Sequence, residues 1–152
     1  MLDFGKIWLY SIEILIMTQR LLDELTYEIN AAAIEVHKSL GPGLLESIYQ
    51  KCLEQELLIR NLSFKSELII PLHYKGIDLK SFIRCDFLVE NAIVIETKSV
   101  DSLIPIHDAQ LLTYMQQLTI PKGILYNFNC VNLLKQGQKT LVNQLFGKLP
   151  LV

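Results

Sequence analysis

Three charged side chains interrupt two neighbouring apolar stretches near the middle of the chain, and their types suit a catalytic site. Asp86 lies in the first stretch, residues 79–89, and Glu96 and Lys98 lie in the second, residues 92–98. Both stretches are rich in β-branched and aromatic residues, which predicts two strands of a hairpin. Burying an unpaired ion costs several kcal/mol. We therefore expect these charges to pair with one another or to hold a metal ion.

The length of the turn between the two strands decides whether the three charges can meet. Glu96 and Lys98 are two residues apart, so both side chains point to one face of their strand, about 7 Å apart. A turn of two residues would place Asp86 on the opposite face. A turn of three residues, 90–92, places Asp86 opposite Glu96. The same register places Arg84 opposite Lys98. A shared site therefore requires a turn of odd length, or a bulge with the same effect.

With that register, the hairpin matches the needs of a metal-dependent phosphodiesterase. The carboxylates of Asp86 and Glu96 suit Mg²⁺ (or Mn²⁺), which is commonly held by one or two carboxylates together with substrate phosphates. The backbone carbonyl of Thr97 is a candidate third ligand. Such an ion polarises a phosphate and activates a bound water, and Lys98 would orient that water or stabilise developing negative charge. The alternative is a structural ion network of the same side chains with Arg84, and the hairpin alone does not decide between them.

Two helices are expected before the hairpin. Apolar residues recur every three to four positions over residues 18–40, which predicts a helix that Gly41-Pro42-Gly43 ends. A second helix is expected over about residues 44–60. Its predicted apolar face consists of Leu45, Ile48, Cys52 and Leu53.

The order of all expected elements describes one small α/β domain. A strand is expected at residues 67–74, where Pro71 indicates an edge position or a bulge. After the hairpin we expect a helix at 106–118, a strand at 124–128 and a helix at 133–145. The resulting order, α-α-β-β-β-α-β-α, predicts a small mixed β-sheet flanked by helices.

Length and composition agree with a single cytoplasmic domain. The chain has 152 residues, of which 51% are hydrophobic, so residues 18–152 can form one domain with a substantial core. A net charge of −2 argues against a strongly basic protein that coats nucleic acid. The three cysteines have no CxxC spacing, which predicts neither a zinc knuckle nor a disulfide framework. A reducing, cytoplasmic setting follows.

Residues 1–17 are interpreted as an N-terminal extension outside this domain. The apolar run at residues 7–17 is too short to span a bilayer, which takes about 20 apolar residues, so no membrane partner is predicted. No small-residue cleavage site follows it. We interpret residues 1–16 as lying upstream of a translation start at Met17, which intact-mass measurement of natively expressed protein would test.

Further motifs resemble the GxxExxY protein family. Gly43, Glu46 and Tyr49 have the spacing that names this family, and six more segments match in order over about residues 22–142. These segments are residues 36–42 (VHKSLGP), 74–76 (YKG), 84–86 (RCD), 95–100 (IETKSV), 107–114 (HDAQLLTY) and 127–129 (NFN). The family is placed in the PD-(D/E)xK nuclease superfamily. The resemblance therefore implies a restriction-endonuclease-like fold and a nuclease.

The resemblance also implies roles for individual residues. Asp86, Glu96 and Lys98 correspond to the core triad of the superfamily. Glu46 corresponds to a helical acid that helps to hold the metal or its water, although periodicity alone describes it as a favourable first-turn acid. Gln110 corresponds to a polar residue that faces the site from the following helix. Two departures from the pattern, Thr97 in place of an aliphatic residue and Cys85 beside the metal-binding Asp, remove no catalytic group.

Three side chains are secondary candidates for binding the substrate. Arg84 is a fork-shaped donor suited to phosphate, or else a salt-bridge partner of Glu96 or Asp86. His107 contacts the site or a phosphate, or is a solvated residue at a helix start. Tyr114 stacks on a base, or packs between helix and sheet.

The expected function is a Mg²⁺-dependent nuclease that hydrolyses DNA, or less favourably RNA. The main alternative is a non-catalytic module on the same fold that binds nucleic acid or protein. A third interpretation is a structural protein that dimerises through an apolar edge strand. A two-fold homodimer would also suit a nuclease that cuts both strands of a duplex.

Overall fold

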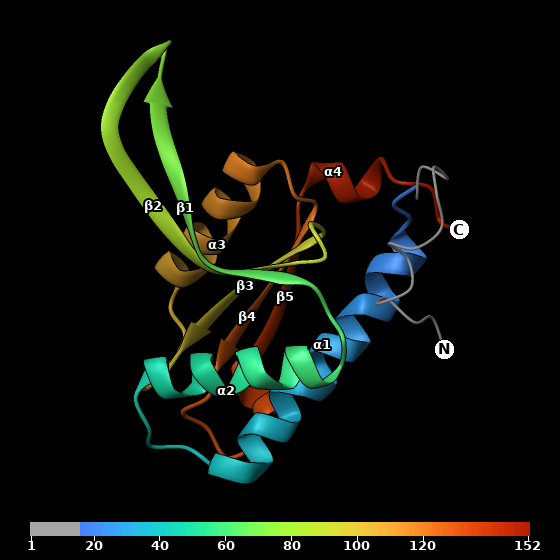
Figure 1. Ribbon diagram of the computed structural model, residues 1–152, viewed down its shortest axis with the longest axis vertical. Coiled ribbons are helices and arrows are strands. Elements are labelled where there is room, and N and C mark those ends of the chain that lie inside the picture. The colour runs from blue at the N-terminus through green and yellow to red at the C-terminus, as the bar shows by residue number, and fades with distance from the viewer. Residues whose placement is uncertain (1–15) are drawn as a thin grey trace.

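The structure, a computed structural model, describes residues 16–152, which form an α/β fold around one five-stranded sheet (Figure 1). The strands are β1 (Phe64–Tyr74), β2 (Ile77–Val89), β3 (Ile93–Lys98), β4 (Lys122–Asn127) and β5 (Gln138–Val142). The helices are α1 (Gln19–Leu40), α2 (Glu46–Ile59), α3 (Pro105–Leu118), the π-helical turn η2 (Leu133–Gly137) and α4 (Gln144–Gly147). All but the last two residues of the predicted N-terminal extension lie outside the described residues.

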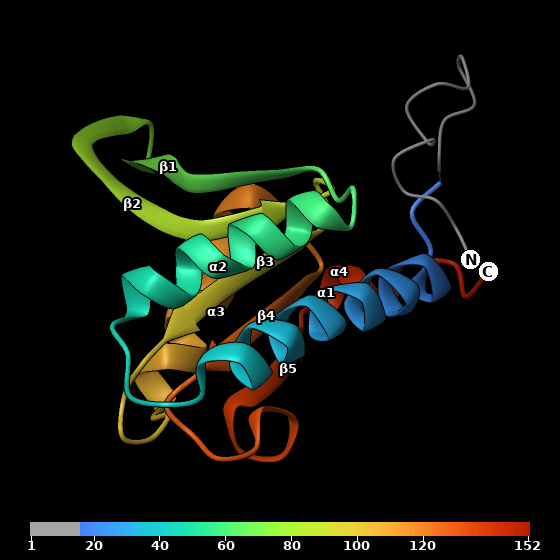
Figure 2. The ribbon, with the colours of Figure 1, turned by 60° about the horizontal axis from the view of Figure 1, so that its bottom comes forward.

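The sheet is mixed, and helices cover both of its faces (Figure 2). The strands lie in chain order, with β3 and β4 parallel and the other neighbours antiparallel. Alternate residues of β3 point to opposite faces, so Ile93 and Ile95 pack against α1 and α2. Val94 packs against α3 on the other face. The predicted fold class is therefore confirmed.

Helix α1 agrees with the helix predicted at residues 18–40. Thr18 caps its start by accepting a hydrogen bond from the backbone N–H of Leu21. At its end Gly41 has a φ of 66° and donates its N–H to the carbonyl of His37, a conformation that favours glycine. The face buried against the sheet and α2 consists of Leu22, Leu25, Ile29, Ala32, Ala33 and Val36.

Helix α2 exists as predicted, but two residues of its predicted apolar face, Leu45 and Ile48, are exposed, whereas Leu53 is buried as predicted. Leu45 precedes the helix. The buried face consists of Tyr49, Leu53 and Leu57. The reason is Tyr49, whose ring stacks on Phe128 with 4.7 Å between the ring centroids and turns that side of the helix toward the core.

The predicted C-terminal helix at residues 133–145 is also wrong. The chain forms the single turn η2, then strand β5, and ends in the four-residue helix α4. Strand β5 pairs antiparallel with β4 from Tyr126↔Gln138 to Lys122↔Val142. Pairing with a distant strand overrides the weak local helical pattern at this sheet edge.

The hairpin of β1 and β2 extends beyond the rest of the sheet (Figure 1). Only residues 87–89 of β2 pair with β3, whereas β1 and β2 pair with each other out to Tyr74↔Ile77. Pro71 lies in this edge strand beside a shift in register between Pro71 and His73, which confirms the prediction from Pro71. We call residues 71–82 the arm; all of its side chains except the half-buried Leu72 are exposed.

Gly137 is a sensitive point of the fold because it lies against the end of β4. A Cβ atom at Gly137 would overlap the backbone oxygen of Asn127 and approach the sulfur of Cys130 to 2.9 Å. We expect Gly137→Ala to destabilise the protein by about 1–3 kcal/mol, the usual cost of overpacking. Thermal unfolding followed by circular dichroism measures this.

The matched control is Gly147→Ala, because a Cβ atom at Gly147 meets nothing within 4 Å. This control should change the stability by less than about 0.5 kcal/mol. Equal melting temperatures for the two variants would contradict the prediction.

Candidate active site

Asp86 and Glu96 lie where the backbone ladder between β2 and β3 opens. The ladder runs from Val89↔Ile93 to Phe87↔Ile95, so three residues form the turn. The backbone N–H of Asp86 donates to Oε1 of Glu96 at 2.9 Å. The turn of odd length that a shared site requires is therefore confirmed, and the Glu96 side chain contacts the backbone of the residue opposite it, Asp86.

Each carboxylate in this gap accepts a backbone N–H from the opposite strand. Oδ2 of Asp86 accepts from both the backbone N–H and the hydroxyl of Thr97, each at 2.8 Å. Side-chain oxygens thus satisfy donors that a regular ladder would satisfy with carbonyls. Among the described residues, no hydrogen bond occupies Oδ1 of Asp86 or Oε2 of Glu96. One oxygen of each carboxylate is available for a further ligand.

Lys98 and Gln110 join this site from β3 and α3. Lys98 follows Glu96 on the same face of β3, and its Nζ donates to Oε1 of Gln110 at 3.0 Å. Both side chains are half-buried, whereas only 3% of Glu96 is exposed. The predicted residue on the following helix therefore contacts the predicted lysine.

Glu46 approaches the same group from the first turn of α2. Burial and then the negative charge of Asp86 raise the pKa of Glu46, while Lys98 acts to lower it. These influences place the Glu46 carboxyl within electrostatic reach of both residues. Glu46 of α2 thus interacts electrostatically with Asp86 of β2 and Lys98 of β3.

The candidate site contains more acidic side chains than basic ones. Burial, followed by the charge of Asp86, raises the pKa of Glu96 to about 8. Burial and the charges of Glu96 and Asp86 also raise the pKa of Cys85 to about 12, so its thiol stays neutral at pH 7. A divalent cation would offset this repulsion.

The donor set fits Mg²⁺ better than a metal that needs a complete protein cage. In residues 16–152, no three His, Cys, Asp or Glu side chains are grouped closely enough to hold a metal by themselves. Magnesium keeps several waters and is often bound by one or two carboxylates together with substrate phosphate. Asp86 and Glu96 provide that number of carboxylates. The carbonyl of Thr97 stays a predicted ligand.

Within the described residues, none of the three secondary candidates forms a hydrogen bond or an ion pair with Asp86, Glu96 or Lys98. The side chain of Arg84 is 3.8 Å from Glu67, and both are exposed, so Arg84 does not form the salt bridge to Asp86 or Glu96 that was the alternative to a phosphate contact. His107 accepts a hydrogen bond from the backbone N–H of Ile104 through Nδ1 and caps α3. Tyr114 is 5% exposed. The buried ring agrees with the alternative of packing between helix and sheet and leaves no face for stacking on a base.

Tyr49 positions the loop before α2, a role that the sequence did not reveal. Its hydroxyl donates to the carbonyl of Gly41 at 2.6 Å and accepts from the N–H of Leu44 at 3.1 Å. The hydroxyl of Ser99, one residue after Lys98, donates to the carbonyl of Leu44 at 2.6 Å. These bonds link the loop that presents Glu46 to the strand end that presents Lys98. The three-residue spacing of Glu46 and Tyr49 was the signal in the sequence that could have indicated this role.

Asn127 secures the other side of the same strand end. Its buried side chain accepts from the N–H of Val100 at 3.1 Å and donates to the carbonyl of Val100 at 2.9 Å. The N–H of Phe128 donates to the carbonyl of Lys98 at 2.9 Å. Asn127 thus fixes the chain where it leaves β3.

A mixed sheet flanked by helices, with an Asp on one central strand and Glu-x-Lys on the next, defines a protein of the restriction-endonuclease-like fold class. The family model described as PD-(D/E)XK nuclease superfamily matches residues 23–141, and the chain belongs to that superfamily. No curated protein and no solved structure is significantly similar to the chain. No helix within residues 16–152 is long and apolar enough to cross a membrane.

Glu96 should make the metal-free protein less stable as the pH rises. Its pKa is raised in the folded state to about 8, above the ordinary value of 4.5, so the folded state holds this proton more tightly. The associated stability is present below about pH 4.5 and is lost as the pH approaches 8. Glu96→Gln keeps an acceptor for the N–H of Asp86 and stays neutral. We expect the variant to exceed the wild type by roughly 2–4 kcal/mol at pH 8, and by little at pH 5.

Urea unfolding in EDTA at pH 5, 6.5 and 8 measures this difference. Glu67→Gln, an exposed position on β1, is the control and should leave the pH profile of the wild type unchanged. Parallel pH profiles for the wild type and Glu96→Gln would show that the burial of Glu96 has no such effect.

Proposed function

We propose that this protein is a metal-dependent nuclease that hydrolyses phosphodiester bonds in DNA, with RNA as the less favoured substrate. The observation that supports it most is the contact between Asp86 and Glu96 in the opened ladder, with Lys98 on the same face of β3. A structural ion network would pair Lys98 with these carboxylates, but Lys98 instead donates to the neutral Gln110. Its ammonium keeps two further N–H donors for a substrate.

Asp86 and Glu96 are the proposed ligands of Mg²⁺ or Mn²⁺, with the carbonyl of Thr97 as a third. When bound, the ion would polarise the scissile phosphate and lower the pKa of a coordinated water. The protein's own contribution is positioning: the N–H and hydroxyl of Thr97 orient the Asp86 carboxylate, and the N–H of Asp86 orients Glu96. Such hydrogen-bonding neighbours orient a metal ligand, and losing one typically lowers metal affinity by about 10–100-fold.

Lys98, Glu46 and Gln110 complete the proposed site. Gln110 holds the Lys98 ammonium at the edge of the carboxylate pair, where it stabilises negative charge on the phosphate in the transition state. Glu46, whose pKa is raised by burial and by Asp86, suits an acid or base that binds a water. Arg84, exposed two residues before Asp86 on β2, is the proposed contact to a neighbouring phosphate.

A non-catalytic module on the same fold, which binds nucleic acid or protein, is the second candidate. It is favoured by the observation that the described residues contain no complete group of three metal-ligating side chains. The two candidates differ in their dependence on the metal and on Lys98.

Metal binding should depend on Asp86. We expect Mn²⁺, titrated calorimetrically into the protein together with a short non-hydrolysable oligonucleotide, to bind at least about tenfold more weakly to Asp86→Asn, since one anionic ligand is lost. The oligonucleotide supplies the phosphate ligands that the site lacks. The control is Asp101→Asn, an exposed acid, which should bind as the wild type does. Equal affinities for all three proteins would exclude a metal site at Asp86.

Cleavage should depend on Lys98 while affinity should not. We expect Lys98→Ala to lower the Mg²⁺-dependent cleavage rate of labelled DNA by roughly 10²–10³, the usual effect of losing one transition-state donor. Its affinity for DNA in EDTA should change by less than about threefold. The control is Lys51→Ala, an exposed lysine of α2.

Two results would contradict the nuclease. One is a wild type that binds DNA equally well with Mg²⁺ or EDTA and cleaves none of a panel of single-stranded, double-stranded and branched substrates. The other is cleavage that Lys98→Ala and EDTA leave unchanged. The first result supports the binding module.

A further inference from the structure

Glu67, on the edge strand β1, has a backbone conformation that strands rarely contain. Its φ is 50°, in the left-handed region, whereas residues of an antiparallel strand have φ near about −140°. Residues other than glycine adopt the left-handed region seldom, and they stay there only where the surrounding structure holds them. The neighbours of Glu67 on both sides pair with β2 as in a regular ladder, Ser66 with Phe87 and Leu68 with Cys85. The irregularity is therefore confined to one residue.

The residue that faces Glu67 across the ladder is Asp86. The register is constant over residues 64–71 of β1, and the pair of Glu67 with Asp86 is the one that is missing from it. On the other side of β2, the ladder with β3 ends at Phe87↔Ile95, one residue short of Asp86. Asp86 is therefore outside the regular ladder on both sides, and the left-handed residue lies directly beside this break.

The side chains of both strands change faces at the break. Along β2, Phe87 and Val89 pack in the hydrophobic cluster that includes α1 and α2, but Cys85 packs in the cluster that includes α3. Along β1, Phe64 packs in the first cluster and Leu68 in the second. Residues two or four positions apart share one face of a regular strand. The hairpin has therefore rotated by roughly half a turn about its own axis at the break, relative to a regular strand pair.

This rotation explains how the Asp86 carboxylate reaches the neighbouring strand. The side chain of a regular strand residue stands roughly perpendicular to the sheet, whereas backbone N–H groups point along the sheet toward the next strand. Oδ2 of Asp86 accepts from the backbone N–H of Thr97 at 2.8 Å. The Asp86 side chain therefore lies close to the plane of the sheet, in the gap between β2 and β3.

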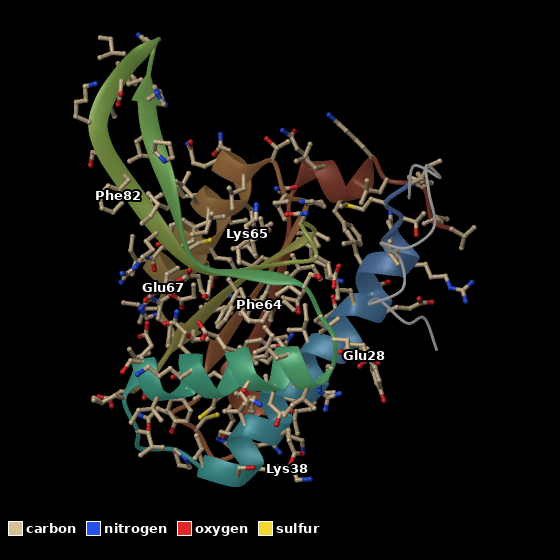
Figure 3. All side chains as sticks on the ribbon, viewed as in Figure 1. Glu28, Lys38, Phe64, Lys65, Glu67 and Phe82 are labelled. Atoms are coloured by element: carbon tan, nitrogen blue, oxygen red, sulfur yellow. The ribbon has the colours of Figure 1, made fainter. Side chains whose placement is uncertain are left out.

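We propose that Glu67 is a positioning residue, whose left-handed backbone rotates the hairpin and thereby holds the Asp86 carboxylate in this gap. The inference rests on the proposed nuclease function and deepens it, because Asp86 is a proposed metal ligand. Figure 3 shows Glu67 near the bend at which β1 turns out of the sheet toward the arm. Strained backbone of this kind is concentrated at functional sites, where it holds groups in position.

The backbone of Glu67 carries this role, and its side chain does not. The carboxylate of Glu67 is 3.8 Å from Arg84, and both side chains are 58% exposed. An exposed ion pair contributes little. Substitutions of Glu67 should therefore rank by their tolerance of a positive φ. Glycine adopts it at no steric cost, glutamine resembles glutamate, and a β-branched residue such as valine is an outlier there.

Paired substitutions at Glu67 and Lys65 test the backbone conformation without reference to any activity. Lys65 is exposed on the same strand, two residues earlier, and pairs regularly with Leu88. We expect Glu67→Gly to keep or raise the melting temperature and Glu67→Val to lower it. At Lys65 the order should be the reverse, because glycine weakens a regular strand and valine favours one. The same order at both positions would show that Glu67 is ordinary strand and would overturn the proposal, even if Glu67→Val does not fold.

The amide resonance of Thr97, followed by NMR in EDTA, reports whether Asp86 stays in the gap. In the wild-type background, Asp86→Asn should shift this resonance, because the Thr97 N–H donates to the Asp86 carboxylate and a bond to a charged acceptor is the stronger one. We expect the same shift in the backgrounds of Glu67→Gly and Glu67→Gln, and its loss in the background of Glu67→Val. A folded Glu67→Val that keeps the shift would overturn the proposal.

Manganese binding connects this geometry to the proposed function. The probe is Mn²⁺, titrated calorimetrically into the protein together with a short non-hydrolysable oligonucleotide. We expect Glu67→Val to bind Mn²⁺ about 10–100-fold more weakly, the usual effect of losing a group that orients a metal ligand. Glu67→Gly and Glu67→Gln should bind within about threefold of the wild type, since both tolerate the left-handed backbone at least as well as glutamate does. Lys65→Val is the matched control, and circular dichroism confirms that each variant is folded.

The failure of this inference can be told apart from the failure of the proposed function. A wild type that binds no Mn²⁺ with the oligonucleotide would overturn the nuclease, and with it the role of Glu67 in the reaction. A wild type that binds Mn²⁺, together with a folded Glu67→Val that binds it equally well, would overturn the positioning role alone.

Discussion

The exchange of backbone hydrogen bonds for carboxylate contacts at Asp86 and Glu96 is the interaction on which the rest of the structure depends. A regular ladder between β2 and β3 would place these two side chains beside a continuous sheet. Instead, the N–H groups of Asp86 and Thr97 donate to carboxylates of the opposite strand. The exchange satisfies the donors while letting the strands separate. Two features follow from this one break: a gap lined with acidic groups, and the freedom of β1 and β2 to continue together as the arm.

The acidity of the gap is costly, and the fold offsets only part of that cost. Glu96 is buried beside Asp86, and Glu46 approaches from α2. Lys98 is the cation that acts on Glu46 and Glu96, and it bonds to Gln110 rather than to a carboxylate. Strongly shifted pKa values of this kind are most frequent at functional sites.

A second set of polar contacts keeps distant parts of the chain at this gap. Tyr49 and Ser99 bond to the loop before α2, and Asn127 bonds to the chain that leaves β3. These side chains reach backbone groups rather than one another. Backbone groups move only with their whole segment, so a few bonds fix the directions of α2 and β3 together. The acid of α2 and the lysine of β3, 52 positions apart in the sequence, are therefore within electrostatic reach of each other.

The sequence by itself determined most of the element types and the central hairpin, because these depend on local periodicity. Alternation over residues 86–98 required a turn of odd length for a shared site, and the three-residue turn satisfies that requirement. The tertiary structure decided which faces are buried. Tyr49, not Leu45 or Ile48, turns α2 toward the core, and Tyr114 is buried although its position also suited base stacking. Strand β5 exists only through its pairing with β4. Periodicity indicates the conformation of a segment, but residues far away in the chain decide which strand or helix it pairs or packs with.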